Sequence, residues 1–157
     1  MRILIAPVKM LFVALALLSL AGCAATVTMA PPAEDAAAKQ FAPASNQANI
    51  YVAREDKFTG SAVAFEFLLD GRGAGSLAPG TFLLLEVEPG EHVLSSTGAE
   101  NQEVVRLTAE AGKNYFYQVE PKMGWVKARL AITQLDDDAG RALVLQTSLA
   151  QDLQLNR

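Results

Sequence analysis

Hydrophobic and polar residues alternate along most of the chain from residue 49 onward. The alternation is clearest in residues 62–70, where Val63, Phe65, Phe67 and Leu69 fall on one side. A period of two is the spacing of a strand with one buried face. Asp-Gly and Pro-Gly turn signals separate the runs. The pattern predicts eight strands, at residues 50–54, 62–70, 73–77, 81–88, 91–97, 102–109, 114–120 and 126–135. Strands spaced by about 8–12 residues are typical of a sandwich or barrel.

The end of the chain has a different pattern. Asp136, Asp137 and Asp138 precede residues 139–153, an apolar-rich stretch that contains Leu143, Leu149 and Leu153. Because Asp is favoured at the helix N-cap, we predict a short C-terminal helix here. The aspartates lack the alternating ligands and distal Glu of a calcium loop, so we prefer a helix start to a metal site.

The first 22 residues have the pattern of a signal peptide. Arg2 and Lys9 precede an apolar run over residues 10–20, and this run makes roughly 16 Å of helix, too short for a bilayer core of about 30 Å. Leu20-Ala21-Gly22-Cys23 resembles the bacterial lipobox. The resemblance implies cleavage before Cys23 and acylation of that residue with chains such as palmitate.

Residues 24–47 are rich in Ala and Pro and show no periodic apolar face. We interpret them as a flexible linker of about 25–30 Å, with room for a short helix at residues 34–40. The predicted organisation is therefore a signal peptide (1–22), a lipidated Cys with its linker (23–47) and one β-domain (48–157).

Composition narrows the classes of function. The chain has 13 Lys and Arg against 17 Asp and Glu, and loss of Arg2 and Lys9 with the signal makes the net charge −6. An acidic chain disfavours nucleic acid as a partner and is repelled by anionic lipid, so acyl chains on Cys23 must hold it to the membrane. With one Cys and one His, we predict no disulfide framework, metal or cofactor.

Residues 49–145 carry a set of turn and core residues in a specific order. They are Ile50-Tyr51-Val52 with Arg54, Asp70-Gly71, Gly75-Ser76-Leu77, Gly80-Thr81-Phe82, Pro89-Gly90 with His92, and Ala111-Gly112-Lys113 with Tyr115 and Tyr117. This set resembles the bacterial lipoprotein family known as domain of unknown function 2846, from which Ala53 departs because an aromatic residue is expected there. The resemblance implies an antiparallel β-sandwich of prealbumin-like or immunoglobulin-like type, and it implies no known activity.

Three groups of residues are candidates for catalysis. The glycines of residues 71–75 lack the dinucleotide spacing and precede a strand. His92 lies on one predicted strand with Ser95 and Ser96, which prevents the convergence that a triad needs. Two of the carboxylates Glu66, Glu86 and Glu88 could act together as the acid and base of a glycosidase. Glu86 and Glu88, however, alternate with apolar residues on one strand and fit its solvated face. We therefore predict a protein that is not an enzyme, with a small hydrolase as the less favoured alternative.

Tyr115, Tyr117 and Trp125 are the best binding candidates, since aromatic rings near Lys122, Lys127 and Arg129 suit sugar stacking or peptide docking. The period of two also allows the opposite register, in which the tyrosines are buried. Arg54 fits either a buried pair or a surface contact. Ala24, in place of Asp after the lipobox, favours the outer membrane. We expect a lipid-anchored binding or scaffold module that faces the periplasm, with an envelope protein or peptidoglycan as its partner.

Overall fold

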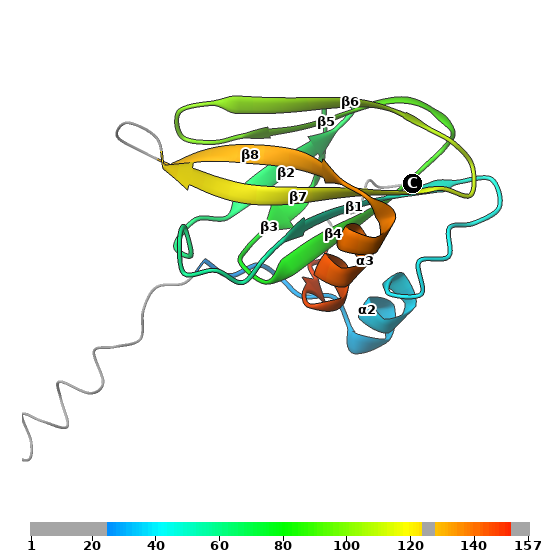
Figure 1. Ribbon diagram of the computed structural model, residues 1–157, viewed down its shortest axis with the longest axis horizontal. Helices are drawn as coiled ribbons and strands as arrows, with labels where there is room; N and C mark the ends of the chain where they lie inside the picture. The colour runs from blue at the N-terminus through cyan, green and yellow to red at the C-terminus, as the bar shows by residue number, and fades with distance from the viewer. Residues whose placement is uncertain (1–24, 124–127, 152–157) are drawn as a thin grey trace, which may run out of the picture.

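The computed structural model describes residues 25–123 and 128–151, and these residues form two facing sheets (Figure 1). The first sheet has the order β8 (Ala128–Leu135), β7 (Asn114–Met123), β1 (Ala48–Arg54), β4 (Thr81–Val87) and β9 (Ser148–Leu149). The second has the order β3 (Arg72–Leu77), β2 (Phe65–Leu69), β5 (Gly90–Thr97) and β6 (Gln102–Ala109). The predicted β-sandwich is confirmed. It is a mixed one, because β1 pairs with β7 and β4 with β9 in parallel.

Strand β1 lies in the middle of its sheet, between β7 and β4. All seven of its residues are buried, because the second sheet covers one face and two helices cover the other. Successive strand side chains point to opposite faces. Ile50 and Val52 therefore join the core between the sheets, while Tyr51 and Ala53 join a second cluster under the helices.

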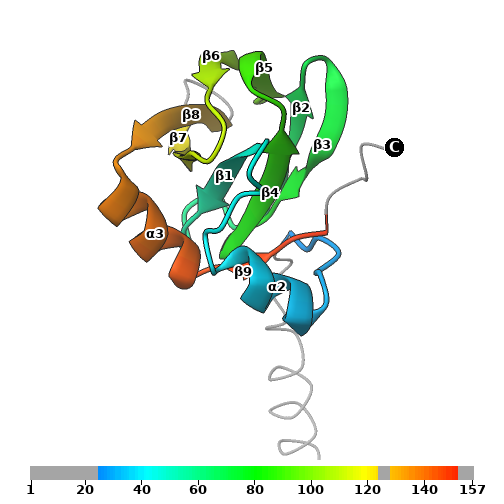
Figure 2. The same cartoon turned by 90° about the vertical axis from the view of Figure 1, so that its right-hand side faces the viewer.

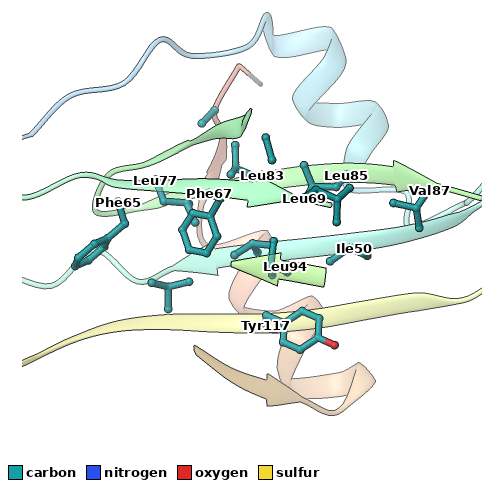
Figure 3. Close-up of a cluster of buried hydrophobic side chains, with 14 of the residues drawn as sticks. Ile50, Phe65, Phe67, Leu69, Leu77, Leu83, Leu85, Val87, Leu94 and Tyr117 are labelled. Atoms are coloured by element: carbon teal, nitrogen blue, oxygen red, sulfur yellow. The ribbon is translucent and has the colours of Figure 1, made fainter. Parts of the chain in front are cut away.

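The inner core lies between the two sheets and is built from alternate residues of the facing strands. Phe67, Leu94 and Ile50 meet there (Figure 3). Strand β2 shows the predicted alternation at Phe65, Phe67 and Leu69, which are buried. The predicted start at residue 62 is wrong, because Val63 lies in the preceding loop and is 37% exposed.

The outer cluster lies on the far face of the five-stranded sheet, under α2 (Pro32–Ala38) and α3 (Asp137–Leu145) (Figure 2). Tyr51 and Phe116 stack there with their ring centroids 5.0 Å apart. None of the helices within residues 25–123 and 128–151 is long and apolar enough to cross a bilayer.

The C-terminal helix starts where the sequence predicts, with the Asp136 side chain accepting a hydrogen bond from the Ala139 amide. The predicted extent to residue 153 is wrong, because the helix ends at Leu145. The Thr147 hydroxyl donates to the Leu143 and Val144 carbonyls. Residues 148–149 then leave the helical path and pair with β4 as β9.

Residues 25–47 lie against the sandwich, in place of the free linker that their composition predicts. The Tyr51 hydroxyl donates to the Ala38 carbonyl at 2.8 Å, and the Asp35 carboxylate accepts from the Leu149 amide at 2.8 Å. Met29 forms a bridge with Ala150. These partners are far away in sequence, so local composition carries no sign of them.

Candidate functional site

Arg54 ends β1, and its side chain is only 1% exposed. Its guanidinium donates to the Val63 carbonyl at 2.6 Å and to the Gly60 carbonyl at 2.7 Å. It also lies 5.1 Å from the centre of the Phe65 ring. Burial lowers the pKa of this guanidinium, which still stays charged at neutral pH. Arg54 is therefore a buried cation that binds backbone carbonyls.

The carbonyls that Arg54 binds belong to residues 55–64, which we term the β1–β2 loop. Two successive turns shape this loop: the Ser61 amide donates to the Phe58 carbonyl, and the Val63 amide donates to the Gly60 carbonyl, each at 3.0 Å. Gly60 has a φ of +75°, and a Cβ added there would lie 2.7 Å from the Pro121 side chain. Packing and Arg54 thus hold the loop in one shape.

A small pocket separates this loop from the end of β7. Its lining residues are Arg54, Glu55, Lys57, Thr59, Val119, Glu120 and Pro121. Lys57 pairs with Glu55 and lies 3.8 Å from Glu120, which also pairs with Lys122 at 2.7 Å.

These pairs keep the charges of the pocket in their ordinary states. The hydrogen bond to Glu55 raises the pKa of Lys57, and the hydrogen bond from Lys122 lowers the pKa of Glu120. Lys57 therefore stays protonated and Glu120 stays ionised at neutral pH. Neither group has the near-neutral pKa that suits a general acid or base.

His92, the single imidazole, connects a turn to the sheet. Its Nδ1 lies 2.7 Å from an Asp70 carboxylate oxygen, and its Nε2 lies 2.8 Å from the Glu88 carbonyl. The other Asp70 oxygen accepts from the Val93 amide. Burial lowers the pKa of His92, but the bonds to Asp70 and to the Glu88 carbonyl outweigh it, so the net shift is upward. One ring nitrogen thus holds the β2–β3 turn against β5, and the other binds the β4–β5 turn.

The tyrosines of β7 adopt the buried register that the sequence left open. Tyr117 is 2% exposed and lies in the inner core (Figure 3). Tyr115 packs partly buried beside this core, and its hydroxyl accepts from the Glu110 amide at 3.0 Å. Phe116 points to the helix-covered face. The two tyrosines therefore form no exposed platform for sugars, because the inner core requires their volume.

Of the remaining sequence-predicted residues, Lys122 and Arg129 lie opposite each other on β7 and β8, and the others cannot be placed. Trp125 and Cys23 lie outside the described residues. Lys122 pairs with Glu120, and Arg129 pairs with Glu100 at 3.4 Å. Within residues 25–123 and 128–151, no group of three or more His, Cys, Asp or Glu side chains could hold a metal ion.

Sequence reasoning missed Phe58, the most exposed large hydrophobic side chain of the described part of the chain. It is 94% exposed near the middle of the β1–β2 loop. The sequence does contain an indication of this residue, since Phe58 is an aromatic residue within the polar run Glu-Asp-Lys-Phe-Thr-Gly-Ser. Only the structure shows that the loop around it is held in place.

Comparison with known proteins gives a family without an assigned activity. A family model described as a protein of unknown function (DUF2846) matches residues 44–130. An uncharacterized protein of Haemophilus influenzae is 29% identical over 147 residues, which cover 91% of this chain and 87% of that protein. No solved structure matches the chain significantly. The family match extends from just before β1 to β8 and includes the β1–β2 loop.

Proposed function

Because the chain belongs to the DUF2846 family of proteins of unknown function, we propose a function from the residues of the chain itself. The protein is a lipid-anchored envelope protein that presents a non-enzymatic binding or scaffold domain. One observation carries this proposal: the single cysteine of the chain, Cys23, follows Leu-Ala-Gly at the end of a signal-like segment. That is the position at which lipobox chemistry requires a thiol.

Acyl chains supply the attachment in this proposal. The body that remains after cleavage has a net charge of −6, so anionic lipid repels it. Two or more acyl chains give stable anchoring without electrostatic help. Ala24 follows the cysteine, and this favours the outer membrane, with the domain in the periplasm.

The side chains best suited to catalysis already have structural partners, which supports a non-enzymatic role. His92 uses its two ring nitrogens to bind two different turns. Arg54 binds two loop carbonyls. We favour an envelope protein over peptidoglycan as the partner, because Tyr117 is buried and cannot stack against a sugar.

The decisive experiment determines the chemical state of Cys23 in the full-length protein expressed in bacteria. We expect mass spectrometry to find a mature chain that begins at Cys23 and carries acyl groups. We also expect membrane attachment that high salt does not remove. A Cys23→Ser variant should lack acyl groups, while a Thr26→Ser control, changed three residues downstream, should be processed normally. A wild-type protein with an unmodified Cys23 thiol would refute the proposal.

A further inference from the structure

The described chain begins beside the β1–β2 loop. The amide of Ala25 donates to the Ser61 carbonyl at 2.8 Å, and Figure 1 shows the start of the described chain next to this loop. Cys23 precedes Ala25 by two residues, which span at most about 7 Å. An acyl group on Cys23 therefore starts close to Ser61.

Ser61 also connects this entry point to the exposed aromatic ring. Its amide donates to the Phe58 carbonyl at 3.0 Å, while its own carbonyl accepts from Ala25. Phe58 is 94% exposed, and Val63 of the same loop is 37% exposed. The most exposed large apolar side chain thus lies in the loop to which the N-terminal segment is bonded.

We propose that the β1–β2 loop contacts the lipid bilayer, with the Phe58 ring inserted at the membrane interface beside the acylated N-terminus. This inference rests on the proposed lipid anchor. Arg54 is the positioning residue, because it holds the Gly60 and Val63 carbonyls. The ring therefore enters the bilayer from a pre-ordered loop and loses little conformational entropy on contact.

The chemistry of the loop favours apolar contact over electrostatic adsorption. Glu55 and Asp56 outnumber Lys57, and Lys57 already pairs with Glu55. Electrostatic attraction between this loop and anionic lipid is therefore weak, whereas moving the Phe58 ring from water into the bilayer interface gives a favourable transfer free energy. Contact through Phe58 should consequently be insensitive to salt.

The test expresses the full-length chain in bacteria and places the acylated mature protein in vesicles of phosphatidylethanolamine and phosphatidylglycerol. Phe58→Trp is made in a Trp125→Phe background, so that a single indole reports on the loop. Val104→Trp in the same background is the matched control. Val104 is 47% exposed on β6, and Figures 1 and 2 place β6 across the molecule from the start of the described chain. Lipids brominated near the headgroup quench an indole that enters the interface.

We expect the indole at position 58 to shift its emission to shorter wavelength on reconstitution. Its quenching should be several-fold stronger than at position 104 and should not change between about 0.05 and 0.5 M NaCl. Flotation with the vesicles tests the anchor separately. If the protein floats but quenching is equal at the two positions, the membrane contact is overturned and the anchor stands. Phe58 would then contact a partner in the aqueous phase. Quenching that salt abolishes overturns apolar insertion. Protein that does not float refutes the anchor, and the membrane contact with it.

Discussion

Replacing Gly140 with alanine should destabilise the domain, although alanine is the better helix former. Gly140 lies in α3, where the helix packs on Phe116 of β7. A Cβ added at Gly140 would lie 2.2 Å from Cγ and 2.3 Å from Cβ of Phe116. The Cβ of Phe116 is bonded to the β7 backbone, so rotation of the ring cannot relieve the clash. The helix must instead move away from the sheet.

Two opposing effects set the magnitude. Alanine improves helix propensity by about 1 kcal/mol. Overpacking of a well-packed contact costs about 1–3 kcal/mol, and the short approach to Phe116 places Gly140→Ala at or above the upper end of that range. We therefore expect a net loss of about 2 kcal/mol. For a domain of this size, that loss lowers the melting temperature by roughly 8 °C.

Urea and thermal unfolding of the wild type and two variants test this reasoning. Ala142→Gly, on the exposed side of the same helix, is the matched control and should lose only about 1 kcal/mol through propensity. Gly140→Ala should lose more than this control. If Gly140→Ala were as stable as the wild type, α3 could shift on β7 without cost, and the close packing inferred here would be refuted.

Three further outcomes are expected. His92→Gln should lose more stability near pH 5.5 than near pH 8.5. Because folding raises the pKa of His92, the contribution of this residue to stability is complete below the unfolded pKa of about 6.5 and is lost as pH rises through the folded pKa. An equal loss in urea unfolding at both pH values would contradict this. Arg54→Met should cost about 3 kcal/mol by leaving two loop carbonyls unpaired and should speed proteolysis within residues 55–64, whereas exposed Arg72→Met should do neither. Asp136→Ala should cost about 1 kcal/mol by removing the N-cap of α3, and unchanged thermal unfolding would show that this cap contributes nothing.

Local pattern was sufficient for strands β1 to β8 and for the start of the last helix, but not for β9, which lies within the predicted helix and forms only by pairing with β4. A period of two places one face of a strand inside, so Phe65, Phe67 and Leu69 identify β2 without any knowledge of its neighbours. Capping is equally local, and Asp136 begins α3 through a bond to an amide three residues away.

Whatever depends on a distant partner was decided only by the tertiary structure. Periodicity groups Tyr115 with Tyr117 but cannot say which face of β7 meets the second sheet. Residues 25–47 have the composition of a linker, yet Tyr51 and Leu149 bond to them across the fold.

Arg54 shows the same limit most clearly, since its charge predicts a partner but not which one. The fold brings two carbonyls of the β1–β2 loop to this cation. Composition, charge, strand spacing and helix caps are local properties, so the sequence by itself determined them. Burial, the docking of the N-terminal segment and the position of Phe58 beside it arise from contacts between segments far apart in the chain, so only the folded structure decided them.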